Sequence, residues 1–414
     1  MARKMPPPPC TTGIGIWRFG AAAILSAAAL TLAACEQEET KPPPPPPPEQ
    51  AILVPASYED LPGWNIDKHA EALPAFLRSC EKFLNQQPGK SLGARIPGAS
   101  AADIQPACRA AQSLPAGHDL AVRAFFEQWF QPWAVSNNAK ADGLFTGYYE
   151  IELKGSITPD DSYNVPVYRK PPDHVTIELG DFDPELAGRT IVGRVDGGRL
   201  KPYYARGDIQ NGALANKGIE LVWLKDPLEA FMLHVQGSGL VTLTDGRKAR
   251  IGFAGHNGYP YKSIGRELID RGELEAHAAS WPNIHAWMLA NPAKAADLLA
   301  VNRRYIFFGE IVGEGPVGAQ GVALTAGRSM AVDTRYIPLG LPLWLDTAMP
   351  GEGAGPLRRL MVAQDTGSAI KGPVRGDFFW GTGEAALEQA GRMKSQGRYY
   401  LLLPKLLANR LASG

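Results

Sequence analysis

The chain carries no excess of either charge, because Lys and Arg total 42 and so do Asp and Glu. Nucleic-acid-binding proteins normally show a basic excess or a basic face, so bulk charge gives no support to nucleic acid as a partner. The seven histidines and four cysteines include no H-E-x-x-H or C-x-x-C spacing, and we expect no metal site. No G-x-S-x-G elbow occurs either, which argues against a serine hydrolase.

One segment, Gly313 to Gly318, has the G-x-G-x-x-G spacing of dinucleotide-binding loops. Pro316 and the extended pattern that follows do not open the helix that such a loop requires. We therefore expect no bound dinucleotide and no other cofactor.

No apolar run near the amino terminus is long enough for a permanent membrane span, since Ala21 to Ala34 falls short of the ~20 residues required. With a basic leader before it, the segment 1–34 is typical of a cleaved signal peptide. It ends in Leu-Ala-Ala before Cys35, which resembles a bacterial lipobox with an acylated cysteine. Glu36, where an Asp would favour the inner membrane, implies the outer membrane, with the protein facing the periplasm. An ordinary secretory signal with an incidental cysteine is the alternative.

An unbroken proline run, Pro42 to Pro48, follows the signal. Such a run adopts polyproline II, which at ~3.1 Å per residue makes a stiff spacer of about 20 Å. We interpret residues 35–55, including acylated Cys35, as an anchor in outer-membrane lipid and a tether that holds the remaining chain off the bilayer.

Cys80 and Cys108 are the two cysteines of the body. In an oxidising periplasm they can form a disulfide. Two buried free thiols are the alternative, because sequence alone does not place their Cα atoms within the ~7 Å that bridging requires.

The body begins with helical patterns. Apolar residues recur at helical spacing over 73–84 and over 122–129, and we interpret both stripes as core rather than as a sugar platform. Helices are expected again between Ile264 and Ala300, where Ser263 can cap the first helix and Pro292 can begin another.

Strand patterns dominate after Gly143, with short apolar runs between Gly, Pro and Asp-Gly turns. The stretch 240–253 predicts a hairpin around Asp245-Gly246. Further strands are expected at 305–312, 331–337, 341–345, 360–364 and 399–403. The predicted fold class is mainly β with helical additions.

Three aspartates lie in glycine-rich phrases of the last third: Asp333 in VDTRYIPLG, Asp365 in AQDTGSAIKG and Asp377 in RGDFFWGTG. Asp333 begins a turn phrase, where capping of backbone N–H groups outweighs direct catalysis. Asp365 ends an apolar run before a tight turn that presents its side chain outward. Asp377 precedes Phe-Phe-Trp, and apolar aromatics raise the pKa of a carboxyl by desolvation, so Asp377 is the best general acid. With the export signal, these residues predict an enzyme that cuts a polysaccharide outside the cytoplasm.

The three phrases resemble the three-aspartate (3D) domain. Four further phrases resemble the membrane-bound lytic murein transglycosylase A (MltA) family: FTGYYE at 145–150, VQGSG at 235–239, GYPYKSIG at 258–265 and YIFF at 305–308. The likeness runs from about Phe145 to Leu403. Ser368 departs from it, standing where the family has a second glycine, and Asn302-Arg303-Arg304-Tyr305 replaces Asn-Pro-Ser-Tyr.

The resemblance implies a double-psi β-barrel that carries the aspartates, an inserted second β-rich domain, and a groove between them. It predicts an N-terminal helical part packing with the barrel over 56–145, the inserted MltA-type β-rich domain over 146–310, and the three-aspartate barrel domain over 311–414.

The implied enzyme is a peptidoglycan lytic exotransglycosylase acting in cell-wall remodelling and turnover. It cleaves the β-1,4 bond between N-acetylmuramic acid and N-acetylglucosamine and leaves a 1,6-anhydromuramic acid end. Position by position, Asp377 matches the catalytic acid/base and Asp365 its companion, which tunes the pKa of Asp377 or stabilises the cationic sugar; Asp333 supports them. The implied partners are peptidoglycan glycan strands and cell-wall synthases.

Substrate contacts are expected in the same regions, although ordinary packing is an equal alternative for each residue. The candidates are Tyr148, Tyr149, Glu150, Gln236, Ser238 and Trp380. Two other functions stay open: a hydrolytic muramidase using the same groove, and a non-catalytic peptidoglycan-binding outer-membrane lipoprotein.

Overall fold

The structure is a computed structural model that describes residues 48–93, 96–313 and 315–413. The predicted signal peptide, Cys35 and most of the tether lie outside the described residues. Within the described ranges, no helix combines the length and the apolar character that a membrane crossing needs.

Three helices form the first part of the body: α1 (Leu73–Leu84), α2 (Ala101–Ala111) and α3 (Asp119–Trp129). Strand β1 (Ala51–Pro55) pairs with β2 (Phe130–Asn137), and β2 joins this part to the main sheet through β16 (Lys394–Pro404). Both predicted apolar stripes are confirmed as core, since Phe76 of α1 and Phe126 of α3 are fully buried with their rings 5.3 Å apart. A disulfide joins Cys80 of α1 to Cys108 of α2, the first of the two alternatives for these cysteines.

Six strands close into a barrel. They are β3 (Gly143–Ser156), β15 (Arg375–Thr382), β12 (Ser329–Val332), β14 (Pro356–Asp365), β13 (Pro342–Ala348) and β16. Each pairs with the next in this order, and β16 pairs back with β3, so the ring is complete. Apolar residues such as Trp344, Val362 and Leu401 are fully buried in its core. The closed mixed ring agrees with the barrel that the family resemblance implies.

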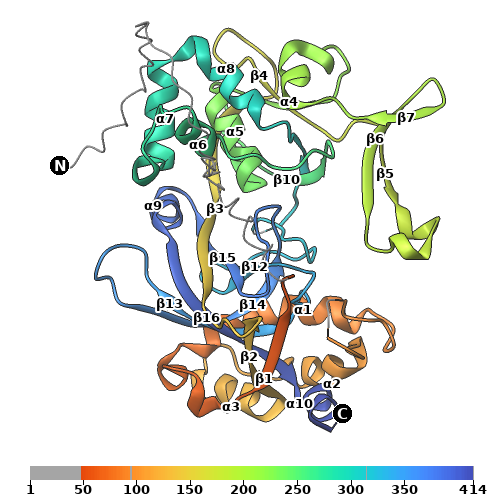
Figure 1. Cartoon of the computed structure of the whole chain (residues 1–414), viewed down its shortest axis with the longest axis vertical. Helices are drawn as coiled ribbons and strands as arrows, with labels where there is room; N and C mark the ends of the chain where they lie inside the picture. The colour runs from red at the N-terminus through yellow and green to blue at the C-terminus, as the bar shows by residue number, and fades with distance from the viewer. Residues whose placement is uncertain (1–47, 94–95, 314, 414) are drawn as a thin grey trace, which may run out of the picture. The chain divides into compact units, whose positions relative to one another are not determined.

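Strand β3 belongs to two sheets. Its first half pairs with β15 and β16 of the barrel, and from Ile151 onward it pairs with β9 (Ser238–Leu243) and β8 (Glu220–Leu224). Figure 1 shows β3 as one long strand, drawn in yellow, that runs out of the barrel toward α5 (Pro227–Gln236). The chain thus links its two β-rich parts by a single continuous strand.

The remaining elements fill in the inserted part and the carboxy terminus. The strands are β4 (Val165–Tyr168), β10 (Lys248–His256) and β11 (Ile306–Glu310), and the helices are α4 (Arg206–Asp208), α6 (Ile264–Asp270), α7 (Trp281–Ala290), α8 (Pro292–Val301), α9 (Glu384–Arg392) and α10 (Lys405–Ser413). A π-helical turn, η6, spans Ile209–Ala213, and short 3-10 helices span Tyr58–Asp60, Trp64–Ile66, His69–Ala72, Leu179–Asp181, Pro184–Leu186 and Ala276–Ala278.

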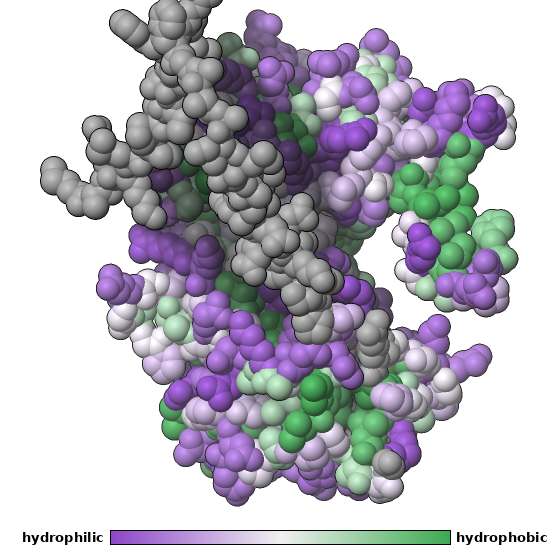
Figure 2. All heavy atoms as spheres, viewed as in Figure 1, coloured by the Kyte–Doolittle hydropathy of each residue, from purple (hydrophilic) through white to green (hydrophobic). Residues whose placement is uncertain are grey.

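A separate three-stranded sheet consists of β5 (His174–Glu178), β6 (Thr190–Asp196) and β7 (Arg199–Pro202). Apolar side chains of β6 remain exposed, with Ile191 44% and Val195 54% accessible. Figure 2 shows hydrophobic residues on this arm, at the right of the view.

Most expected elements are confirmed. Strands β9 and β10 form the predicted hairpin, the Ser263 side chain accepts a bond from the Arg266 N–H, and Pro292 begins α8. The strand predicted over 331–337 is wrong beyond Val332, because the carbonyl of Asp333 accepts the N–H groups of Tyr336 and Ile337 in a turn. Strand β15 was not predicted, since two glycines and three consecutive aromatics hide its alternation.

Candidate active site

Asp377 and Asp365 are brought together by the register of three barrel strands. Asp377 in β15 is the pairing partner of Ala331 in β12, and Asp365, the last residue of β14, is also paired with Ala331. Directly paired residues point to the same face of a sheet, so both carboxylates lie on the face of Ala331, one strand to either side. Ala331 presents only a methyl group between them.

The Asp377 carboxylate is held by a side chain from β3. Thr146 lies opposite Asp377 in the parallel β15–β3 pair, and its hydroxyl donates a short hydrogen bond to Asp377 Oδ1. The same hydroxyl accepts a bond of 2.7 Å from Arg375 Nη2. Because the guanidinium can only donate, the Thr146 hydrogen is directed to Asp377.

The surroundings of Asp377 favour its protonated form. Burial raises the pKa of the Asp377 carboxyl above its ordinary value, while the Thr146 hydrogen bond and the Arg375 charge act in the opposite direction. The side chain nevertheless keeps an intermediate solvent exposure, so a substrate can reach it. Asp377 therefore combines access with the ability to hold a proton.

Asp365 is fixed by its own loop. Its Oδ1 accepts the main-chain N–H groups of Ala319 and Thr366, each at 2.9 Å. Burial raises the pKa of Asp365 to about 6, and the charge of Asp377 contributes in the same direction, against the effect of the two N–H groups. A carboxyl in this state changes its charge near neutral pH.

Tyr148 completes the cluster. It follows Thr146 by two residues on the same face of β3, and its ring lies 5.2 Å from that of Phe379, its register partner on β15. Burial, then the charges of Asp365 and Asp377, raise the pKa of Tyr148, so its hydroxyl stays protonated. This hydroxyl makes no hydrogen bond of good geometry with a described residue, although its proximity lowers the pKa of Asp365.

Asp333 has a structural position. Its carboxylate is 1% exposed and accepts bonds from the Arg335 guanidinium and from the main-chain N–H of Gly372 at 2.8 Å. Although burial acts to raise it, these hydrogen bonds hold the pKa of Asp333 below its ordinary value. Asp333 thus ties its own turn to the loop that separates Asp365 from Asp377, as the capping interpretation expects.

Two comparisons of the sequence point to one family. The MltA specific insert domain matches residues 144–309 and the 3D domain matches residues 328–403. The membrane-bound lytic murein transglycosylase A of Escherichia coli strain K12 is 32% identical over 276 residues, which cover 65% of this chain and 68% of that protein. This chain belongs to the MltA family.

Solved structures agree with this assignment. The crystal structure of a membrane-bound lytic murein transglycosylase from Agrobacterium tumefaciens superposes with a TM-score of 0.77 at 35% identity, covering 86% of this chain and 99% of that one. E. coli MltA with bound chitohexaose gives a TM-score of 0.59 at 26% identity, covering 86% of this chain and 92% of that one. The recognition and the mainly β fold with helical parts are therefore confirmed.

The two departures from the MltA phrases are accommodated. Ser368 does not have a positive φ, so the turn after Asp365 does not depend on glycine at this position. In the NRRY phrase, Asn302 is 2% exposed, and its carbonyl and that of Arg304 both accept bonds from Arg206.

Glu150 requires reassignment. The sequence analysis placed it among the substrate contacts, but its side chain is fully buried. Arg250 Nε donates to Glu150 Oε1 at 2.8 Å and the Thr382 hydroxyl donates to Oε2 at 2.8 Å. Because both oxygens are engaged inside the protein, we assign Glu150 to the support of β3 where it leaves the barrel.

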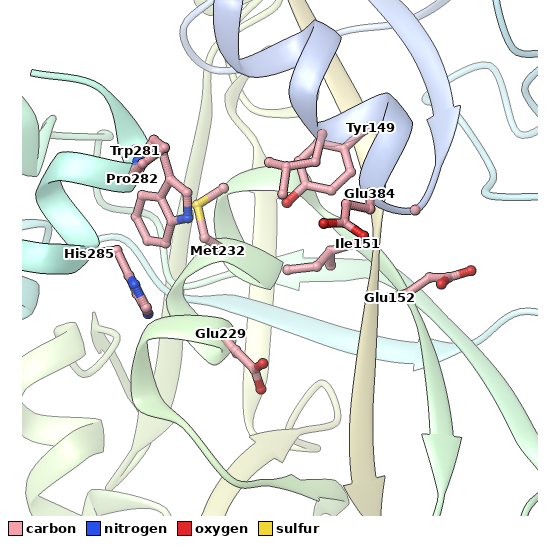
Figure 3. Close-up of a pocket in the computed structure, with 11 residues that line it drawn as sticks. Tyr149, Ile151, Glu152, Glu229, Met232, Trp281, Pro282, His285 and Glu384 are labelled. Atoms are coloured by element: carbon pink, nitrogen blue, oxygen red, sulfur yellow. The ribbon is translucent and has the colours of Figure 1, made fainter. Parts of the chain in front are cut away.

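Tyr149 lies on the opposite face of β3 from Tyr148, where it lines a cavity of about 400 Å³. Figure 3 shows Tyr149 and Glu384 on one side of this cavity and Trp281 on the other, with Met232 between them and Glu229 below. The lining residues come from β3, α5, α7 and α9, so both β-rich parts contribute. The aspartates do not line this cavity, since they lie with Tyr148 on the other face of β3.

The other predicted contacts differ in accessibility. Gln236, at the end of α5, accepts the main-chain N–H of Tyr149 at 3.2 Å, and Ser238 is partly exposed at the start of β9. Trp380 packs on Phe378 with ring centroids 4.5 Å apart, and its indole N–H is buried. It rests on Gly147, where an added Cβ would lie 2.5 Å from the indole nitrogen, so only glycine fits beneath the ring.

Two residues of the cluster were missed in the sequence. Thr146 and Arg375 each stand two positions before a predicted site residue, Tyr148 and Asp377 respectively. Because strand residues two apart share a face, assigning both segments to strands would have placed all four side chains together. In the part of the chain that the structure covers, no group of three or more His, Cys, Asp or Glu residues is arranged to hold a metal ion.

Proposed function

We propose that this chain is a lytic transglycosylase that cleaves the β-1,4 bond between N-acetylmuramic acid and N-acetylglucosamine in peptidoglycan, with Asp377 as its general acid and base. The observation that carries the proposal is a reachable carboxyl of raised pKa, fixed by Thr146, inside an MltA fold. The chitohexaose bound to E. coli MltA, a related protein, supports an oligosaccharide as the ligand.

The reaction needs one proton carrier and no water. Asp377 donates its proton to the glycosidic oxygen as the bond from that oxygen to C1 breaks. The C6 hydroxyl of the same muramic acid then attacks C1, and its proton returns to Asp377. Because the nucleophile is tethered to the electrophile, effective molarities of ~10⁵–10⁸ M are accessible, and one acid–base residue suffices.

Thr146 defines which oxygen of Asp377 carries the proton. Its hydroxyl donates to Oδ1, so the carboxyl hydrogen belongs on Oδ2, which has no hydrogen-bond partner among the described residues. Asp365 is the less suitable donor, because two main-chain N–H groups hold its Oδ1 and favour its ionised form. In our proposal, ionised Asp365 stabilises the positive charge that develops at C1, and Asp333 supports the loop between the two.

Groove contacts are proposed for Tyr148, beside both carboxylates, and for Tyr149, Gln236, Ser238 and Trp380. The partly exposed Trp281, opposite Tyr149, adds a further flat surface for a sugar ring. Exo-acting cleavage in cell-wall turnover, with cell-wall synthases as partners, belongs to the same proposal.

The chain is further proposed to be anchored in the outer membrane through acylated Cys35, facing the periplasm, with residues 1–34 removed and 35–55 as the tether. The Cys35→Ala variant should move from the detergent-extracted membrane fraction to the soluble periplasmic fraction. For the body we propose the division 56–145, 146–310 and 311–414, which the two family matches support.

Digestion of purified sacculi tests the activity. Mass spectrometry of the released muropeptides should show 1,6-anhydro ends, about 18 Da lighter than hydrolysed ends because one water is not added. Release of hydrated ends would indicate a muramidase. Co-sedimentation with sacculi without any soluble product would indicate a binding protein and would overturn the proposal.

A further inference from the structure

Arg206 is a buried cation without an acidic partner in the described ranges. It is 3% exposed, its Nε donates to the Asn302 carbonyl at 3.0 Å, and its Nη2 donates to the Arg304 carbonyl at 2.7 Å and to His234 Nδ1 at 3.1 Å. The rings of Phe231 and Tyr305 lie beside the guanidinium, with centroids 4.8 Å and 5.2 Å from Cζ. None of these groups carries a negative charge, and burial of a charge without a counter-ion is costly.

Two hydrogen-bond donors of this cluster remain free. Arg206 Nη1 makes no hydrogen bond, and His234 Nε2 carries the ring hydrogen because Nδ1 accepts from Arg206. Neither atom is among the sealed polar atoms without a partner, so both reach solvent-accessible space. Burial and the Arg206 charge keep the pKa of His234 well below its ordinary value, so the ring is a neutral donor.

Both residues line a cavity of about 870 Å³. This volume lies in the ~300–1,000 Å³ range of ligand pockets, and much of the wall is aromatic, with Tyr168, Trp223, Phe231 and Tyr305. Glu220 is the acidic residue of the wall, and its charge is not among the influences on the pKa of Arg206.

The rim of the cavity has unusual backbone geometry. The π-helical turn η6 contributes Ile209 and Gln210, and Asn216 contributes from a positive φ of 61°. π-Helical turns occur frequently at functional sites, and non-glycine residues at positive φ are uncommon. Such features cost stability, which is consistent with a rim retained for binding.

Helix α5 connects this cavity to the catalytic strand. Phe231 and His234 line the cavity, whereas Glu229 and Met232 line the one beside Tyr149. At the end of the same helix, Gln236 accepts the main-chain N–H of Tyr149, the residue after Tyr148. A ligand held by His234 therefore lies within the element that supports the proposed active site.

We propose that this cavity is a second binding site, which takes a carboxylate of the peptide stems carried by peptidoglycan glycan strands. The inference rests on the proposed function, because it assigns the ligand to the same polymer. The stem peptides are where that polymer carries its free carboxylates, and a carboxylate supplies the negative charge that Arg206 lacks. Charge-assisted bonds from Nη1 and the His234 N–H would hold it, with the aromatic wall against the apolar part of the peptide.

Calorimetric titration with a stem peptide tests the site directly. The protein is the full-length chain with Asp377→Asn, which prevents turnover, and the probe is L-Ala-γ-D-Glu-meso-diaminopimelate-D-Ala. We expect binding that weakens at least tenfold when the carboxylates of the probe are amidated. Arg206→Gln should weaken binding at least tenfold, whereas Lys225→Gln, which removes an exposed cation outside the cavity wall, should leave it within twofold.

A second variant covers the case in which Arg206→Gln does not fold. Ala215 is an exposed wall residue, so Ala215→Trp fills the cavity while leaving Arg206 in place. It should also weaken peptide binding at least tenfold. Unchanged binding by folded Ala215→Trp protein, or equal binding of the amidated peptide, would overturn the inference.

Cleavage assays separate this inference from the proposed function. Ala215→Trp should slow the release of anhydro-muropeptides from intact sacculi about tenfold, and leave cleavage of glycan strands stripped of their peptides unchanged. Equal rates on intact sacculi for the parent and the variant would argue against the site. Absence of anhydro product from both substrates with the unaltered enzyme would instead reject the proposed function, while the peptide titration would still report on the cavity.

Discussion

Asp365 and Asp377 lie on either side of a single strand, β12, and both are in register with its Ala331. One carboxylate is fixed by main-chain N–H groups and the other by the hydroxyl of Thr146. Two residues twelve positions apart in the chain thus become a coupled pair with different surroundings, and this difference allows separate roles.

Replacement of each aspartate should affect catalysis to a different degree. Asp377→Asn removes the proton carrier, and we expect anhydro-muropeptide release to fall at least about 10³-fold. Asp365→Asn should cost about 10- to 100-fold, because it removes only charge stabilisation. Rates come from chromatography of products released from sacculi. The reverse ranking would transfer the acid/base role to Asp365.

Thr146 is predicted to act by positioning Asp377. Thr146→Val keeps the shape and removes the hydroxyl, so kcat should fall about tenfold. Because the Thr146 bond lowers the pKa of Asp377, its loss should raise that pKa and move the high-pH limb of the kcat profile to higher pH. Thr146→Ser is the matched control and should restore both the rate and the limb. A Val variant with a reduced rate but an unmoved limb would indicate a packing role only.

The raised pKa of Asp365 predicts a pH-dependent gain in stability for Asp365→Asn. A carboxyl with a pKa of about 6 in the folded state and an ordinary pKa when unfolded destabilises the protein as pH rises through the folded value. The amide cannot ionise, so the variant should be about 1–2 kcal/mol more stable than the parent at pH 7.5. The gain should vanish near pH 4, below both values. Denaturant unfolding at the two pH values measures it, and a gain independent of pH would contradict the assignment.

Arg250 should stabilise the fold through Glu150. Arg250→Met leaves a fully buried carboxylate without its cation, which typically costs about 3–5 kcal/mol. Lys248→Met removes an exposed cation from the same strand and should change the free energy of unfolding by less than about 0.5 kcal/mol. If Glu150→Gln left stability unchanged but raised KM for glycan strands, Glu150 would have to be returned to the substrate contacts.

The disulfide between Cys80 and Cys108 closes a loop with a sequence separation of 28 residues. The chain-entropy model gives about 3–4 kcal/mol of stabilisation for a loop of this length. The double variant Cys80→Ser/Cys108→Ser should lose that amount in urea unfolding. Reductant should lower the stability of the parent toward that of the variant and leave the variant itself unchanged.

The helical first part of the body was predictable because its signals are local. Apolar spacing over 73–84 places Phe76 and Cys80 on one face, and the structure buries both. The Asp-Gly hairpin and the Ser263 cap depend on residues within a few positions of each other, so the chain specifies them without help from distant segments.

Strand β15 and the site around it were harder to predict. RGDFFWGT has no clean alternation, because Gly147 and the barrel core accept its aromatics on both faces. Arg375 and Thr146 become part of the site only through the parallel pairing of β15 with β3, two segments 230 positions apart that share no local signal.

The sequence by itself determined the family, the candidate aspartates and the local elements, since each of these resides in contiguous phrases such as AQDTGSAIKG and RGDFFWGTG. Tertiary structure alone decided which carboxylate receives which hydrogen bonds, that Glu150 is buried against Arg250, and that Arg206 faces a cavity without a counter-ion. The physical reason is that charge stabilisation, burial and strand register arise between segments far apart in the chain. Their partners exist only once the barrel has closed.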